Sequence, residues 1–227
     1  MRVLAIDTAL EACSAAVLDT GQAAILATES QLMVRGHAEA LMPLVAAVMT
    51  QAQVGFGDID RIIVTTGPGS FTGLRVGIAA ARGFGLAASK PVVGVTTLAA
   101  LAAPYIAADD SVPIAAVIDA RHHHVYLQLF GAGGRTLIPP RVVPVREAVH
   151  AAAAASARLV GSGAGMIAHE WPEGQDPPQV VDERRAPDID WVARLGAAAD
   201  KEQSAPKPLY LRAPDAHPQS AAHLPRR

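Results

Sequence analysis

One segment, residues 67–89, limits the folds open to this chain more than any other. It starts with the glycine turn GPGSFTG, which follows a predicted strand, and continues as a predicted helix over 72–89. Small residues recur at every fourth position of that helix, at Gly73, Gly77, Ala81 and Gly85. Because a glycine inside a helix costs about 1 kcal/mol relative to alanine, we expect close packing against another backbone to offset the cost.

Charge is almost absent from the same helix. Its only charged residues, Arg75 and Arg82, are seven positions apart and share one narrow stripe. A helix that is apolar or small on nearly all other sides is typical of a core, or of a surface to which another subunit contributes a layer of packing.

The predicted helix before it, over residues 37–53, also has features of a contact surface. Met33, Met42 and Met49 are three of the five methionines in the chain. Clustered methionines suit adaptable contacts, although core packing is the alternative. Pro43 predicts either a kink or a later start of this helix. We predict that the two helices contact a second polypeptide through His37, Met42, Ala46, Met49, Gly73, Leu74, Gly77, Ile78, Ala81 and Gly85.

The order of the predicted elements indicates an α/β fold with two similar halves. Strands within residues 2–29 form an antiparallel meander, and the strand–helix–strand order of 61–96 implies a right-handed parallel crossover. The second half has a predicted hairpin over 114–130 and another glycine turn after a strand, within 158–165.

Three divisions of the chain follow from this order. We predict an N-terminal subdomain over 1–97, which carries the contact helices, and a C-terminal subdomain over 98–212 with a helix at 146–157 and a short helix at 188–200. The proline-containing tail 213–227 is expected to be flexible.

Asp7 and Thr8 end the first predicted strand, where a carboxylate and a hydroxyl can hold a metal-bound phosphate. Actin-like and sugar-kinase ATPases carry a glycine two residues after such an aspartate, but this chain has Ala9 there. With Gly67 and Gly69, these two residues are the weak candidates for a nucleotide site. Asp7 is alternatively a structural acceptor in a turn.

The turn GPGSFTG matches neither common phosphate loop. It lacks the lysine of a Walker loop, and Thr72 stands where a dinucleotide loop has its third glycine. The alternative is a tight turn in which Ser70 or Thr72 caps the following helix.

Charge, cysteine content and hydropathy exclude several other classes. The formal net charge of −2, from 19 basic and 21 acidic residues, gives no reason to expect direct binding of nucleic acid. Cys13 is the only cysteine, which indicates a reducing compartment. We interpret Cys13 itself as a small residue of the core or of a turn. The tract His122–His124 predicts no more than an adventitious metal contact. The uncharged stretch 91–108 contains two prolines, which favours a buried strand and helix over a membrane span. We expect a cytoplasmic protein with no metal, cofactor or membrane contact.

Five segments together resemble the TsaB family, namely LAIDTALEACSAAV, GPGSFTGLRVGIAAARGFGLA, PVVGVTTLAALA, VIDAR…VYL and the late PLYLR. The similarity runs from residue 3 to about residue 212. It implies an actin-like ATPase (ASKHA) fold, with two similar subdomains whose mixed sheets are flanked by helices. The wider family has an older name, glycoprotease.

The resemblance also implies a function. TsaB proteins are required for tRNA threonylcarbamoyladenosine modification, the transfer of threonylcarbamoyl to N6 of the adenosine 3′ to the anticodon. They are regarded as non-catalytic subunits that pair with the catalytic subunit TsaD through helices of the N-terminal domain, and a P-loop ATPase subunit, TsaE, joins them. A homodimer is expected when the partner is absent, and tRNA is contacted only indirectly.

The resemblance also predicts where the active site is missing. A TsaD-type homologue would carry metal-binding histidines on the helix that corresponds to 97–103, where this chain has Leu98, Ala99, Ala100 and Leu101. We therefore expect an accessory subunit with no catalytic residues. The alternative is a stand-alone actin-like ATPase or small-molecule kinase that uses Asp7 and the glycine turns.

Overall fold

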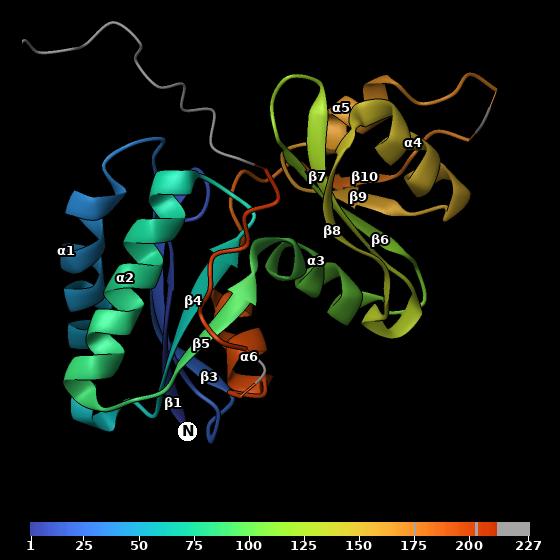
Figure 1. Cartoon of the computed structure of the whole chain (residues 1–227). Helices are drawn as coiled ribbons and strands as arrows, with labels where there is room; N and C mark the ends of the chain where they lie inside the picture. Colours follow the sequence, from blue (N-terminus) through green and yellow to red (C-terminus); the bar gives the residue numbers. More distant parts are fainter. Residues whose placement is uncertain (175, 203, 213–227) are drawn as a thin grey trace, which may run out of the picture.

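The computed structural model describes residues 1–174, 176–202 and 204–212 and contains two five-stranded sheets, each flanked by helices (Figure 1). The first sheet has the strand order β3-β2-β1-β4-β5. Its strands are β1 (Arg2–Asp7), β2 (Ala12–Asp19), β3 (Ala24–Leu32), β4 (Arg61–Gly67) and β5 (Val92–Thr96). The second sheet has the order β10-β9-β6-β7-β8. Its strands are β6 (Ile114–Asp119), β7 (His124–Phe130), β8 (Thr136–Pro144), β9 (Arg158–Val160) and β10 (Val180–Asp182).

Both sheets have the same topology. β1 pairs antiparallel with β2 and parallel with β4, and β6 pairs antiparallel with β7 and parallel with β9. In each sheet an antiparallel meander therefore continues into a parallel part. This duplication confirms the predicted α/β class and the two similar units of the actin-like (ASKHA) fold.

Helices α1 (His37–Gln51) and α2 (Phe71–Ala88) lie side by side against one face of the first sheet (Figure 1). Their inner side chains form a core with Leu4, Ile6 and Val64 of the central strands. α1 starts at His37 with Pro43 inside it, so the later start that Pro43 also allowed is wrong. Ser70 accepts a hydrogen bond from the Gly73 amide at 3.3 Å, which confirms it as the cap of α2.

The opposite face of the first sheet is covered by α6 (Ile189–Ala198), a helix that comes late in the sequence. Ile189, Val192 and Ala193 pack there against Val3 and Ala5 of β1. α3 (Thr97–Ala108) contacts α6 and both sheets. The two sheets therefore do not correspond to two uninterrupted halves of the chain, and the subdomain boundary at 97/98 stays a prediction.

Helices α4 (Val145–Ala154) and α5 (Ala164–His169) pack on the second sheet, and two short 3₁₀ turns, η1 (Phe56–Asp58) and η2 (Ala132–Gly134), complete the fold. No element is predicted from the sequence for the segment of β8, which contains Pro139, Pro140 and Pro144. The strand is at the edge of its sheet, where a residue without an amide proton breaks no internal ladder.

Residues 204–212 form an extended strap that connects the two sheets. The Gly94 amide of β5 donates to the Ser204 carbonyl, and the Leu209 amide donates to the Thr66 carbonyl of β4, both at 2.7 Å. The strap ends where the Arg212 guanidinium donates to the Ala120 carbonyl at 2.9 Å, just after β6. The tail 213–227, predicted to be flexible, lies outside the described residues. Within the described residues, no helix has the length and apolar character to cross a membrane.

Candidate functional site

Asp7 ends β1 in a fully buried position. Its Oδ1 accepts hydrogen bonds from the Thr65 hydroxyl and, at 3.0 Å, from the Ala9 amide. Its Oδ2 has no hydrogen-bond partner in the part of the chain that the structure describes. Burial raises the pKa of this carboxyl above its usual value, in spite of the hydrogen bond from Thr65. A carboxylate that accepts a hydrogen bond from the amide two residues later acts as a turn acceptor.

The glycine turn after β4 closes over the same hairpin. A Cβ at Gly69 would overlap the Ala9 carbonyl, and the Ser70 amide donates to that carbonyl at 2.7 Å. Thr8 is equally enclosed, because its hydroxyl donates to the Gly73 carbonyl at 2.7 Å. Of the four nucleotide candidates, Asp7, Thr8 and Gly69 thus lie in one packed turn region, and Gly67 lies against Leu74 and Leu209. Their assignment to a nucleotide site stays a prediction.

The glycine stripe of α2 faces the protein's own sheet. A Cβ at Gly77 would lie 2.5 Å from Thr8 Oγ1, and Cβ atoms at Gly73 and Gly85 would overlap the Thr8 carbonyl and Val92. Leu74, Ile78 and Ala81 are also buried on this side of α2. The interpretation of this stripe as a contact with a second polypeptide is therefore wrong. Its glycines let α2 approach β1, β4 and β5 closely.

Two of the predicted contact residues of α1 are buried, and the other two are exposed. His37 and Met49 are buried, and His37 Nε2 donates to the Leu10 carbonyl at 2.9 Å. Met42 and Ala46 point outward, and the Met42 side chain is 55% exposed.

The outer face of α1 and α2 exposes mainly apolar and small residues, with Glu39 as an exposed carboxylate on α1 and with Arg75 and Arg82 exposed on α2. We call it the α1–α2 face and define it by its exposed residues Met42, Pro43, Ala46, Thr72, Ala79, Gly83 and Leu86. Leu86 is 85% exposed. Gly83 is unlike the other glycines of α2, because a Cβ at this position would meet nothing within 4 Å.

The strap binds the only two charged residues of α2. Arg82 donates to the Pro206 carbonyl at 2.7 Å, and Arg75 Nε donates to the Tyr210 hydroxyl at 3.2 Å. The Arg75 guanidinium also lies 3.7 Å from the centre of the Phe71 ring. The arginine stripe therefore borders the α1–α2 face without crossing it.

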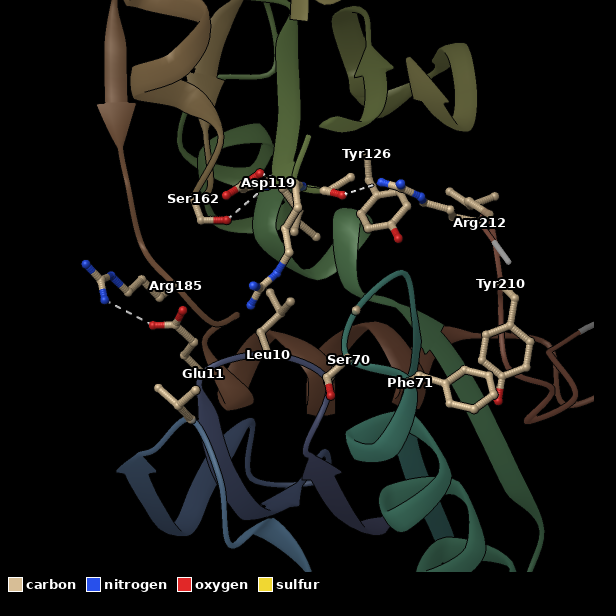
Figure 2. A pocket seen from close by; sticks show the side chains of 17 residues that line it. Leu10, Glu11, Ser70, Phe71, Asp119, Tyr126, Ser162, Arg185, Tyr210 and Arg212 are labelled. Carbon is tan, nitrogen blue, oxygen red and sulfur yellow. Dashed lines mark hydrogen bonds and ion pairs between the residues drawn. The ribbon is translucent and has the colours of Figure 1, made fainter. Parts of the chain in front are cut away.

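A cleft of about 720 Å³ opens where the carboxyl ends of the central strands of both sheets meet (Figure 2). Glu11 and Arg185 form an ion pair of 3.1 Å at one end, and Phe71 stacks with Tyr210 at the other, with ring centres 5.0 Å apart. Further charge comes from Asp119, Arg121 and Arg212. No sequence pattern identified Arg121, Arg185 or Arg212 as site residues. Arg121 and Arg212 do lie in VIDAR and PLYLR, two of the segments that resemble the TsaB family.

α3 (Thr97–Ala108) carries no histidine, cysteine, aspartate or glutamate. Leu98, Ala100 and Leu101 are fully buried between the sheets. In the described ranges, no group of three histidine, cysteine, aspartate or glutamate side chains is arranged to hold a metal ion.

Comparison with known proteins agrees with this architecture. The duplicated sheets define the chain as an α/β protein of the actin-like class. Residues 27–176 match the family described as TsaD: tRNA N6-adenosine threonylcarbamoyltransferase. YeaZ from Pseudomonas aeruginosa is 30% identical with a TM-score of 0.77, over 92% of this chain and 99% of that chain.

Two sequence relatives narrow the assignment. The tRNA threonylcarbamoyladenosine biosynthesis protein TsaB of Escherichia coli (strain K12) is 39% identical over 126 residues, which are 56% of this chain and 53% of that protein. An uncharacterized protein of Mycobacterium tuberculosis is 37% identical over 218 residues, 95% of this chain and 94% of its own length. The chain belongs to the TsaB family. Its match spans only about half the length of the E. coli and Haemophilus influenzae TsaB proteins, 53% and 52%.

Proposed function

We infer that this chain is a non-catalytic subunit required for tRNA threonylcarbamoyladenosine modification, and that it binds and activates a TsaD-type catalytic subunit through the α1–α2 face. The E. coli and H. influenzae relatives are named for this biosynthesis. In this proposal the TsaD-type subunit transfers the threonylcarbamoyl group, a TsaE-type P-loop ATPase joins the complex, and tRNA is contacted only indirectly. The complex acts in the cytoplasm.

Gly83 is the observation that supports this surface. An exposed glycine inside a helix lowers helix stability by about 1 kcal/mol relative to alanine, and no contact with the residues that the structure describes requires it here. A second helix that approaches α2 closely would require it. Met42 and Leu86 beside it are exposed apolar side chains of the kind that anchor interfaces. When the partner is absent, the same surface would pair two copies of this chain.

The rival function, a stand-alone ATPase or small-molecule kinase, lacks comparable support. It depends on Asp7, which is fully buried beneath the Ala9 turn. Nucleotide turnover by the purified chain that disappears in Asp7→Asn would favour this rival.

The test is co-purification with a co-expressed TsaD-type subunit. Gly83→Trp and Leu86→Glu should each weaken the complex at least about tenfold, because bulk or charge then lies in the interface. Ala198→Glu, at an exposed position of α6 on the opposite side of the sheet, is the matched control and should co-purify like the wild type. Thermal unfolding of each isolated variant checks that its fold is retained. A complex that survives both interface substitutions with unchanged affinity contradicts the proposed surface.

Activation is tested separately. The TsaD-type subunit should modify tRNA faster with the wild-type chain than with Gly83→Trp. Equal rates, with and without this chain, would contradict the activating role even if the complex forms.

A further inference from the structure

A groove of about 530 Å³ lies between β3 and residues 182–190, the segment that connects β10 to α6. One wall consists of Thr28, Ser30 and Leu32, which share one face of β3 because side chains alternate along a strand. From the first to the last of these the strand advances four residues, about 13 Å. The other wall is also formed by consecutive residues. The groove is therefore elongated and fits about four residues of an extended peptide.

Leu32 is an exposed apolar side chain of this groove. It is 84% exposed, and Val34, two residues later, is 71% exposed. β3 is an edge strand, and proteins commonly protect such edges with proline or charge. The edge strand β8 has three prolines, whereas the only charged residue of β3, Glu29, already accepts a hydrogen bond from Gln51 at 2.6 Å. Large apolar side chains that are exposed beside a groove are typical of a surface that a partner covers.

Carboxylates outnumber guanidinium groups along the groove. The four carboxylates belong to Asp182, Glu183, Asp188 and Asp190, and the two guanidinium groups belong to Arg184 and Arg185, which leaves an excess of two negative charges. Both arginines are already engaged, because Arg184 pairs with Asp182 at 2.7 Å and Arg185 pairs with Glu11 at 3.1 Å. Among the described residues, no ion pair engages the other three carboxylates of the groove.

Asp190 shows this lack of positive charge most directly. Burial, followed by the nearby Asp188 carboxylate, raises the pKa of Asp190. Asp188 is partly compensated, since it accepts a hydrogen bond from the Asp190 amide at 3.0 Å and the amino end of a helix carries partial positive charge. Glu183 is exposed and lies outside that helix. A positively charged ligand would therefore stabilise the ionised carboxylates of Asp190 and Glu183.

We propose that this groove binds an extended basic segment of a partner protein, with an apolar side chain of the segment against Leu32 and its lysine or arginine side chains at Glu183 and Asp190. The elongated shape and the exposed leucine favour a peptide over a small cation. The negative charge excludes a nucleic-acid strand as the occupant. The groove is at the start of α6, on the side of the first sheet opposite to α1 and α2, so the interaction does not depend on the α1–α2 face.

The experiment is a fluorescence anisotropy titration of the purified full chain with a fluorescein-labelled pentapeptide of alternating lysine and leucine, blocked at both ends. Saturable binding with a Kd below about 1 mM is expected, and a matching peptide of alternating glutamate and leucine should not bind. Raising the salt concentration from about 0.05 M to about 0.5 M should weaken the binding several-fold, because it screens the carboxylates.

Two variants locate the peptide. Leu32→Ser should weaken binding about tenfold, because the leucine becomes covered in the complex. Glu183→Gln should weaken it about threefold, since a single exposed ion pair contributes less. Leu86→Ser and Glu39→Gln are the matched controls: each makes the same change at an exposed position, on α2 and α1 respectively, and should leave the affinity unchanged. Thermal unfolding checks that all four variants retain the fold.

Several results would overturn the proposal. They are the absence of saturable binding, an unchanged affinity in Leu32→Ser, and an equal loss in Leu86→Ser, which would place the peptide on the α1–α2 face instead. Equally tight binding of spermine would show that charge alone decides the affinity. The chain itself ends with Arg226 and Arg227, so the double variant Arg226→Gln/Arg227→Gln tests this end as a rival occupant. Peptide binding about tenfold tighter in this variant would identify the chain's own end as the occupant.

Discussion

Gly77 of α2 and Thr8, the residue after β1, are in such close contact that a Cβ at position 77 would lie 2.5 Å from the Thr8 hydroxyl oxygen. That hydroxyl is itself fixed by its hydrogen bond to the Gly73 carbonyl. The contact packs α2 against the β1–β2 turn, next to the fully buried Asp7.

We expect Gly77→Ala to destabilise the isolated chain by about 1–3 kcal/mol, although alanine is the better helix former, because the added methyl group overpacks the contact with Thr8. Gly83→Ala is the matched control on the same helix. It should stabilise the isolated chain by about 0.5–1 kcal/mol, since its Cβ meets no other atom. The free energy of unfolding in urea measures both effects. Equal changes in the two variants would contradict the inward orientation of the stripe.

Asp7 predicts a decrease in stability as the pH rises. Burial raises the pKa of this carboxyl in the folded state above its usual value, so the folded state binds more protons than the unfolded state once the pH exceeds about 4. The free energy of unfolding of the wild type should therefore fall relative to that of Asp7→Asn as the pH rises from about 4 towards the raised pKa of the folded state.

Asp19 provides the control of opposite sign. Its pKa is lowered, chiefly by the hydrogen bond from the Gly21 amide, so its contribution to stability is present above the unfolded pKa and is lost as the pH falls. Asp19→Asn should lose stability relative to the wild type as the pH rises. Urea titrations of the wild type, Asp7→Asn and Asp19→Asn over the same pH range determine the sign of each pH dependence. The same slope for both variants would contradict the assigned environments.

Cys13 should be nearly inert towards thiol reagents in the folded chain. Burial, followed by the nearby Asp7 carboxylate, raises the pKa of this thiol from 9.0 to about 11, which lowers the thiolate fraction about 100-fold before steric protection is counted. The rate of reaction with a chromogenic disulfide near neutral pH, compared with the rate in denaturant, measures this protection. A native rate within about tenfold of the denatured rate would show that the site opens readily.

The strap should loosen when its anchor on α2 is removed. Arg82→Gln shortens the side chain that donates to the Pro206 carbonyl. Amide hydrogen exchange at Gly94 and Leu209, whose amides donate to the Ser204 and Thr66 carbonyls, should then become about tenfold faster. Arg194→Gln, at an exposed position on α6, should leave both exchange rates unchanged. Unaltered protection in Arg82→Gln would mean that the two backbone hydrogen bonds hold the strap without the arginine.

The order of the elements could be predicted from the sequence because it depends on local pattern. Short runs of apolar and small residues mark β1 and β2, and the glycine turn at 67–70 marks the start of α2. The side to which α2 turns its small residues could not be predicted. A stripe of period four shows that something approaches closely, but it does not show that the approaching atoms belong to Thr8, which is distant in sequence, and to Val92 on β5.

The cleft could not be predicted from local sequence pattern either, because residues that are distant in sequence form it. Arg212 and Ala120 are 92 residues apart, and only the path of the strap brings them together. Arg121 gave one local signal, its place in an Asp-Ala-Arg turn. The backbone conformation that directs it into the cleft is set by hydrogen bonds with His124 and Val145, on β7 and α4.

Because α6 covers the β1 face formed by Val3 and Ala5, the first sheet is completed by one of the last helices to be synthesised. Translation adds roughly 5–20 residues per second, so a nascent chain exposes this apolar face for several seconds after β5 has left the ribosome. Premature termination before residue 189 would leave the same face permanently uncovered, and such truncated products should be bound by chaperones or degraded rather than accumulate as half-proteins.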